Sequence, residues 1–398
     1  MTPELRDRIK QIRHGNVPEG YKRTRSGIVP MEWNEVCLGD IYTERKEPGN
    51  ESLPMLMVSI HSGVSDGEVD EEDLPKKVKR IEDKSQYRRA AKGDLVFNMM
   101  RAWQGAIGTV RTEGMVSPAY IVAEPNDMVD PLFMDYYMKT KRMVQTIHRQ
   151  SYGVTDFRLR LYWDSFAPIQ CVLPSVKEQK KIAEILTAQD KAIELKEKYL
   201  AEKQRQKKYL MQQLLTGKKR LLGLDGPWHT VRIGEALTIK HGRGQHEVES
   251  VDGKYPILGT GGEIGRTDHY LYNKPSVLIG RKGTIDSPQY MDEPFWTIDT
   301  LFYSEIHEGY HPKYLYYVFC NIKWSQHNEA SGVPSLNART IETLCISLPE
   351  YTEQIKIAQV LSTVDKELHM LQLSVEQEKQ KKKALMQLLL AGIVRVKA

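Results

Sequence analysis

The chain has 398 residues, of which 40% are hydrophobic and 27% charged, and its net charge is +5. The length predicts two or three domains, the composition is typical of a soluble globular protein, and the mild basicity is compatible with a polyanionic partner. No run approaches 18 apolar residues, which argues against a membrane span. The four cysteines are isolated, without CxxC or metal-ligand spacing, which argues against a zinc site and disulfides and favours a cytoplasmic chain.

Residues 1–172 predict a first α+β domain with an N-terminal helical segment. In chain order we expect a short strand that enters a helical turn, an apolar strand followed by a glycine-rich basic turn, another strand, an aromatic-rich helix and a closing polar loop. These segments read WNEVCLGDI from Trp33, GDLVFNMMRAWQGAIGTV (93–110), SPAYIV (117–122), FMDYYMKTKRMV (133–144) and SYGVTDFRLRL (151–161).

Residues 173–220 predict one long helix. Leu173-Pro174 ends the preceding strand, Ser175 can cap the first turn, and Gly217 stops the last. Neither Gly nor Pro interrupts the segment between them, so a helix of about 40 residues would be about 60 Å long.

Residues 221–347 predict a second α+β domain, and residues 348–398 a second long helix, capped by Thr352 and stopped by Gly392. The second domain repeats the order of patterns in the first, but most of the letters differ. Its segments read WHTVRIGEAL from Trp228, PSVLIGRKGTIDSPQY (275–290), IDTLFYSEI (298–306), PKYLYYVFCNIKW (312–324) and ASGVPSLNART (330–340).

The two long helices form an internal repeat. A shift of 175 residues gives 18 identities over the 45 positions 173–217, far above chance. The apolar positions follow the alternating spacing of a coiled-coil seam, so we expect the helices to pair antiparallel within one chain, although pairing with another chain is the alternative. The expected seam and partner interface comprises Ile182, Leu186, Ile193, Leu200, Leu210, Leu214, Ile357, Leu361, Leu368, Val375, Leu385 and Leu389.

The sequence offers no catalytic constellation. The segment GTGGEIGR (259–266) has Ile264 where a dinucleotide fingerprint needs its third glycine, so we expect a turn or a close backbone approach. A phosphate-binding P-loop is absent, and Asp292-Glu293-Pro294-Phe295 matches the motif of amino-methyltransferases only superficially. We therefore predict a chain that binds no cofactor or metal.

Basic residues interleaved with glycine, aromatic and amide side chains predict DNA contacts in both domains. The alternative for any single residue is a solvated surface, and Trp103 could belong to the core. The candidates are Arg88, Arg89, Arg101, Trp103, Gln104 and Tyr152 in the first domain, and Arg266, Arg281, Lys282, Thr284, Ser331, Ser335 and Asn337 in the second.

From about Gly20 onward the chain resembles the specificity (S) subunit of type I restriction–modification systems. The resemblance rests on LPSVKEQKKIAEILTAQDK with its echo LPEYTEQIKIAQVLSTVDK, on the helix ends LMQQLLTG and LMQLLLAG, and on domain motifs such as NMMRAWQGAIGTV and SGVPSLNARTIETLCISLP. It implies two target recognition domains separated by two long helices in an antiparallel coiled coil with pseudo-twofold symmetry. The first domain departs from the second at Thr155 and Asp156, which stand where the second has Pro334 and Ser335.

The resemblance also implies a function. Each recognition domain would read one half of a split target in the major groove of double-stranded DNA, and the helices would set the spacing. Two methyltransferase (M) subunits would bring S-adenosylmethionine, and restriction (R) subunits would bring ATP and magnesium. The alternatives are a coiled-coil scaffold without a DNA role, an enzyme that uses the segment 259–266, and the specificity subunit of a methylation-only system.

Overall fold

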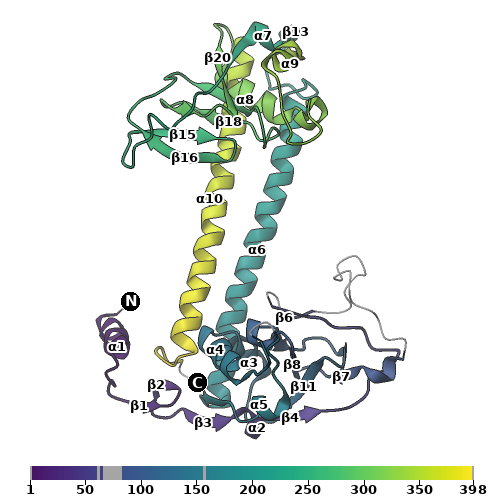
Figure 1. Cartoon of the computed structure of the whole chain (residues 1–398), viewed down its shortest axis with the longest axis vertical. Helices are drawn as coiled ribbons and strands as arrows, with labels where there is room; N and C mark the ends of the chain where they lie inside the picture. Colours follow the sequence, from purple (N-terminus) through teal and green to yellow (C-terminus); the bar gives the residue numbers. More distant parts are fainter. Residues whose placement is uncertain (1, 61–62, 66–82, 156–157, 397–398) are drawn as a thin grey trace. The chain divides into compact units, whose positions relative to one another are not determined.

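The computed structural model describes residues 2–60, 63–65, 83–155 and 158–396. They form two compact units, one of Met1–Leu195 with Val375–Ala398 and the other of Lys196–Ser374. Each unit holds an α+β domain and part of each of two long helices, α6 (Val176–Leu214) and α10 (Tyr351–Leu389) (Figure 1). The predicted fold class, α+β domains separated by two long helices, is confirmed.

The first domain is built on an antiparallel sheet with the strand order β4-β11-β8-β9. Successive side chains of its apolar strand, β8, point to opposite faces, so Leu95 and Phe97 join the large core while Val96 joins a smaller cluster. In chain order the elements are α1 (Pro3–Arg13), β1 (Tyr21–Thr24), β2 (Gly27–Pro30), β3 (Asn34–Cys37), α2 (Leu38–Ile41), β4 (Tyr42–Arg45), β5 (Val58–Ser59), β6 (Gly63–Val64), η2 (Lys84–Gln86), β7 (Arg88–Ala90), β8 (Leu95–Asn98), η3 (Ala102–Gln104), β9 (Ile107–Thr109), β10 (Gly114–Val116), β11 (Tyr120–Pro125), α3 (Pro131–Met138), α4 (Lys141–Gln150), α5 (Trp163–Phe166) and β12 (Gln170–Leu173).

The second domain repeats this plan with the antiparallel order β14-β20-β17-β18. Its apolar strand β17 also divides its side chains, Val277 and Ile279 into the large core and Leu278 into a smaller one. Its elements are β13 (His229–Arg232), α7 (Ile233–Ala236), β14 (Leu237–Lys240), β15 (Tyr255–Gly259), β16 (Gly262–Thr267), β17 (Ser276–Gly280), β18 (Gln289–Met291), β19 (Trp296–Thr297), β20 (Leu301–Ile306), α8 (Pro312–Asn321), η4 (Trp324–His327), α9 (Ala338–Thr343) and β21 (Cys345–Leu348).

The two long helices run antiparallel within each unit, as predicted. In the first unit, Gln189 of α6 donates to Glu378 of α10 over 2.7 Å. In the second unit, Lys196 donates to Ser374 over 2.9 Å, and further along α6 Lys203 pairs with Glu367 at 3.4 Å. Residue numbers rise along α6 as they fall along α10, so the helices are antiparallel. Each of these contacts joins two residues of the same chain, so the pairing is internal to the chain.

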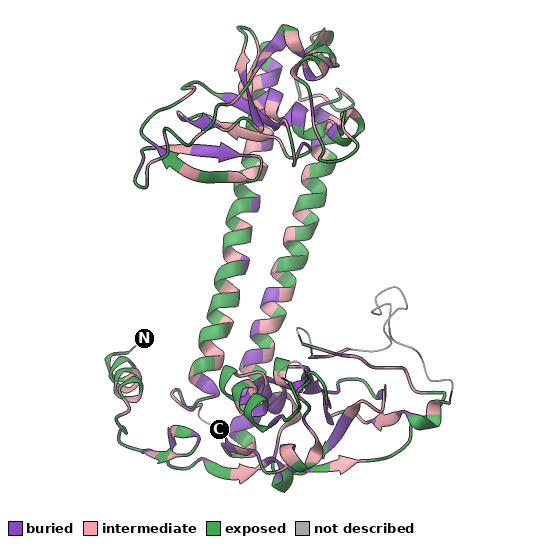
Figure 2. Ribbon diagram, viewed as in Figure 1, coloured by how far each residue is buried: buried purple, intermediate pink, exposed green. Residues whose placement is uncertain are grey.

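The predicted seam residues divide into two groups. One group is buried, and six of its members, near the helix ends, belong to the domain cores; the other group is partly buried. Between the domains, most of the surface of α6 and α10, which we call the stem, is exposed (Figure 2). The buried ones are Ile182, Leu186, Ile193, Leu214, Ile357, Leu361, Leu368, Val375 and Leu389. The partly buried ones are Leu200, Leu210 and Leu385.

The helix ends carry the predicted glycines. Gly217 and Gly392 both have φ 69°, a left-handed conformation that favours glycine at the end of a helix. A Cβ at Gly217 would lie 3.2 Å from the Trp228 ring. The predicted cap at Ser175 is confirmed, since its hydroxyl accepts from the amide of Glu178 at 3.3 Å. The predicted cap at Thr352 is wrong, because Thr352 is already the second residue of α10.

Candidate nucleic-acid interface

Two loops of the second unit, about 50 residues apart in sequence, lie against each other. We call residues 281–284 and 328–337 the loop pair. Lys282 and Ser335 form an antiparallel bridge. The amide of Leu336 donates to the carbonyl of Arg281, and the amide of Gly283 to that of Pro334, both over 2.9 Å. The structure therefore brings together six of the seven residues predicted in this domain.

The side chains of the loop pair combine charge with hydrogen-bonding groups. The Arg281 guanidinium donates to the carbonyl of Asp299 at 3.2 Å, which orients it. Asn337 caps α9, since its side-chain oxygen accepts from the amide of Arg339 at 2.9 Å. The remaining predicted members are Lys282, Thr284 and Ser331, which are exposed, and Ser335, which is half-buried. Exposed ammonium, hydroxyl and amide groups of this kind contact phosphates and base edges.

Asn328 is a member of the loop pair that the sequence did not single out. Its side-chain oxygen accepts from the amides of Ala330 at 3.1 Å and Ser335 at 2.9 Å. It thereby holds the second loop in shape, in the way that asparagine commonly stabilises turns. The sequence signal that could have identified this role is an asparagine shortly before a loop segment that contains Gly332 and Pro334.

Arg266 lies apart from the loop pair, on β16 of a second sheet. It pairs with Glu263 at 3.0 Å and donates to the carbonyls of Gly253 and Lys254 at 3.3 Å. The glycine-rich segment 259–266 forms the turn between β15 and β16 together with β16. A strand follows that turn, where a dinucleotide-binding loop would lead into a helix.

In the first unit, Arg101, Trp103 and Gln104 occupy the turn after β8, the position that residues 281–284 occupy after β17. The amide of Leu161 donates to the carbonyl of Met99 over 2.9 Å, so the segment after Tyr152 reaches this turn. That segment is described except for residues 156–157, so Asp156 lies outside the described residues.

The side chains at this turn differ in exposure. Trp103 is partly buried: its indole donates to the carbonyl of Met100 at 3.0 Å, and its ring contacts His148 edge-on at 5.6 Å. Arg101 and Gln104 are exposed, and Tyr152 is 57% exposed with its ring beside Tyr162.

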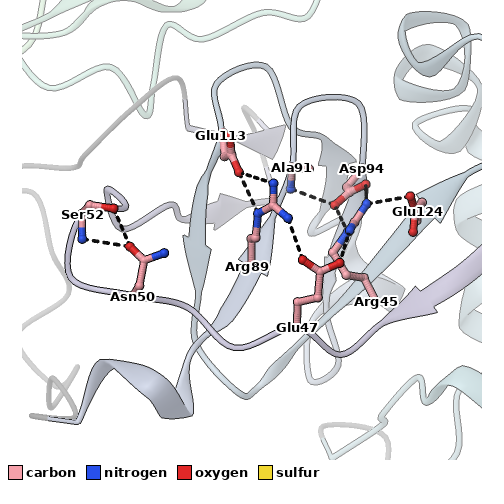
Figure 3. Close-up of polar contacts among 9 residues, drawn as sticks. All are labelled: Arg45, Glu47, Asn50, Ser52, Arg89, Ala91, Asp94, Glu113 and Glu124. Atoms are coloured by element: carbon pink, nitrogen blue, oxygen red, sulfur yellow. Dashed lines mark hydrogen bonds and ion pairs between the residues drawn. The ribbon is translucent and has the colours of Figure 1, made fainter.

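Arg88 and Arg89 lie on β7, where carboxylates already pair with them (Figure 3 for Arg89). Arg89 bonds Glu47 at 2.6 Å and Glu113 at 2.7 Å, which raises the pKa of its guanidinium. Arg88 pairs with Glu44 at 3.1 Å. A phosphate contact by either arginine would have to displace these carboxylates, so the structure does not bring the two arginines into an open basic surface.

The same network is anchored by a residue that the sequence reading missed. Arg45 of β4 donates to the buried carboxylate of Asp94 at 2.8 Å and pairs with Glu124 at 2.9 Å (Figure 3). These pairs raise the pKa of Arg45, although burial opposes the shift. Arg45 and Asp94 are 49 residues apart in the sequence, so no local pattern could predict their contact.

The described residues show neither a metal site nor a membrane span. Among them, no three His, Cys, Asp or Glu side chains are grouped to hold a metal ion. No helix within the described ranges has the length and apolar character needed to cross a bilayer.

Comparisons with known proteins agree on one family. Residues 226–378 match the family model described as "Type I restriction modification DNA specificity domain". The chain is 23% identical over 436 residues to the type I restriction enzyme MjaVIII specificity subunit of Methanocaldococcus jannaschii, across 95% of this chain and 97% of that relative. It is 24% identical over 429 residues to the putative MjaX specificity subunit of the same organism, with the same coverage.

The fold has a counterpart among solved structures. The S subunit of a type I restriction–modification system from M. genitalium superposes with a TM-score of 0.59 at 14% identity, over 92% of this chain and 97% of that one. At this identity the likeness concerns the fold. The chain therefore carries a type I restriction–modification specificity domain over residues 226–378, and along nearly its whole length it is similar to specificity subunits of such systems.

Proposed function

We propose that this chain reads a split target on double-stranded DNA, one half with each domain, and that it carries the partner subunits that act on the DNA. The observation behind this is the position of the candidate residues. In both units the turn after the apolar strand bears exposed polar side chains that include a cation, Arg101 and Gln104 after β8 and Lys282 and Thr284 after β17, on scaffolds that share their strand order. Equivalent turns with different side chains suit two readers of different sequences.

The chemistry of the two turns fits complementary tasks. Lys282 and Thr284 can bind phosphates, while Arg281, Asn337 and Gln104 can reach base edges. Each mismatched base pair costs about 1–3 kcal/mol, so two short half-sites multiply specificity. In this proposal residues 1–172 and 221–347 are the recognition domains, and residues 173–220 and 348–398 form the spacer.

Partner subunits would dock on the stem. In the second unit, Tyr199, Met370 and Leu373 leave 53%, 64% and 46% of their surfaces exposed on the two long helices. A shallow groove of about 610 Å³ runs beside Tyr199 and Met370. An exposed apolar face on paired helices suits two M subunits, which would bind S-adenosylmethionine, and R subunits, which would use ATP and magnesium. The specificity subunit itself is non-catalytic.

Methylation mapping tests the proposal directly. In cells that carry the chain with its partner subunits, we expect the methylated motif to have two defined halves and an undefined spacer of fixed length. A methylated motif without an interruption would contradict the proposal.

A binding experiment with matched variants tests the loop pair. In the assembled complex, Lys282→Ala should weaken DNA binding and lower the slope of affinity against salt by about one unit, as the loss of one phosphate contact does. Lys274→Ala removes the same charge from an exposed site elsewhere in the unit and should leave the slope unchanged. Equal effects of the two variants would assign the change to net charge and remove the loop pair from the interface.

A further inference from the structure

A buried tyrosine of the first domain joins both long helices. Tyr136 of α3 is 4% exposed, and its hydroxyl donates to Asp190 of α6 over 2.7 Å. The other oxygen of that carboxylate pairs with Lys382 of α10 at 2.5 Å. The Lys382 ammonium also lies 5.5 Å from the centre of the Tyr136 ring. Three elements of the first unit therefore meet at one carboxylate.

The second unit contains the same triad. The hydroxyl of the fully buried Tyr317, on α8, donates to Asp365 of α10 over 2.6 Å, and Lys207 of α6 pairs with Asp365 at 2.5 Å. The carboxylate and the ammonium have exchanged helices, as expected when two copies of one helix run antiparallel. A neighbouring hydroxyl is repeated as well, since Thr187 and Ser362 lie 3.3 and 3.2 Å from the respective tyrosines.

These contacts constrain geometry more than an apolar surface does. A hydrogen bond to a charged group depends on distance and direction, whereas hydrophobic burial has no preferred direction. A slide of one helical turn, about 5.4 Å, would separate Asp190 from Lys382 and so break the ion pair. The tyrosine extends the same constraint from the paired helices to the domain.

We propose that Tyr136, Asp190 and Lys382, and their counterparts Tyr317, Asp365 and Lys207, are positioning residues that set the angle of each recognition domain on the stem and so select the spacer length. The proposal rests on the proposed function. One base pair of spacer corresponds to about 3.4 Å along DNA, so a small rotation of a domain is enough to admit a neighbouring length.

The test uses Tyr136→Phe and Tyr317→Phe, singly and together, in the complete methylating complex. Each change removes one hydroxyl and keeps the buried ring, so folding and the core are retained. The matched control is Tyr209→Phe on α6, which is 56% exposed and whose hydroxyl has no partner among the described residues. Methylation is then mapped on DNA that carries both halves of the wild-type target at the native spacing and at one base pair more or less.

We expect the triad variants to keep both halves of the motif but to lose spacer selectivity. The ratio of methylation at native to altered spacing should fall about tenfold, the effect of one hydrogen bond of ordinary strength. The control should keep the wild-type ratio. An equal loss of methylation at every spacing would show a purely structural role and overturn the inference, as would an unchanged ratio.

The proposed function can fail separately from this inference. If the wild-type complex methylates an uninterrupted motif, both fall, because there is no spacer to select. If the wild-type motif is split and the triad variants keep its spacing, only the positioning role falls.

Discussion

At the scale of single residues, identical letters in the two helical repeats occupy identical contacts. Glu178 is 3% exposed and accepts two hydrogen bonds from Arg395, at 2.7 and 2.9 Å. Glu353 is 2% exposed and accepts two from Arg220, at 2.8 and 2.7 Å. In each unit the pair ties the start of one long helix to the segment that follows the other. The sequence showed the repeated glutamates without their partners.

Removal of one such arginine tests this clamp. Arg395→Leu leaves the Glu178 carboxylate buried without a cation, and we expect the free energy of unfolding to fall by about 2 kcal/mol, since Arg395 is itself partly exposed. Denaturant unfolding of the assembled complex measures the change. Glu178→Gln in the same background should recover most of the loss, because no unpaired charge remains. Loss without recovery would point to packing instead.

The cysteines give a second prediction at this scale. Cys171 is buried in β12, and burial raises the pKa of its thiol to about 12. Near pH 8 only about one molecule in ten thousand would carry the reactive thiolate. Alkylation followed by mass spectrometry should label the exposed Cys345 in the native protein and Cys171 only after unfolding. Labelling of both at one rate would contradict the burial of β12.

At the scale of elements, the two long helices have the same length and the same relation to their domains. Both contain 39 residues, and their bounds differ by the same shift as the sequence repeat. Their ends complete the domain cores, where Ile182 and Leu186 serve one unit and Ile357 and Leu361 the other. The ends of the two helices are therefore fixed by packing against the domains, and their exposed middle is the face on which we propose that partners dock.

Two residues of one helix separate these roles. Leu368 is 8% exposed and Met370 is 64% exposed, two positions apart on α10. We expect Leu368→Ala to lower stability by about 2–3 kcal/mol, the usual cost of truncating a buried leucine, and Met370→Ala to leave stability unchanged. Thermal unfolding measures both. Met370→Ala should instead weaken assembly with the M subunits, and normal assembly would argue against docking on this face.

At the scale of the whole molecule, the chain is one plan used twice. Both units carry an antiparallel four-stranded sheet, a helix bearing the triad tyrosine and a strand that leads into a long helix. The units differ in most of their side chains, including those on the turns after β8 and β17, and in their smaller sheets. Variable loops on a shared scaffold are how one fold can serve many targets.

Exchange of one domain tests this modularity. Replacement of residues 222–347 with the corresponding segment of a similar specificity subunit should change one half of the methylated motif and preserve the other half. The reason is that the helices, which the exchange leaves intact, carry the contacts to both domains. Methylation mapping before and after the exchange measures both halves, and a change in both would show that the domains do not read independently.

The sequence by itself determined what depends on local pattern. The bounds and length of α6 follow from an uninterrupted run between Pro174 and Gly217, because proline and glycine act on the backbone next to them. The repeat of two long helices on either side of a domain predicted antiparallel pairing, and apolar runs followed by glycine-rich basic turns predicted the strands β8 and β17. Residues 281–284 and 331–337 were predicted to share a role in DNA contact, but the sequence did not predict that the two segments touch.

Only the tertiary structure decided which charges are engaged and which residues meet across the fold. Arg88 and Arg89 looked like free cations, but Glu44, Glu47 and Glu113 approach them through strand pairing. Tyr136 corresponds to Tyr317, although a constant shift of 175 residues does not align them, because the domains differ in length. Side-chain partners depend on distances in space, and a sequence records only distances along the chain.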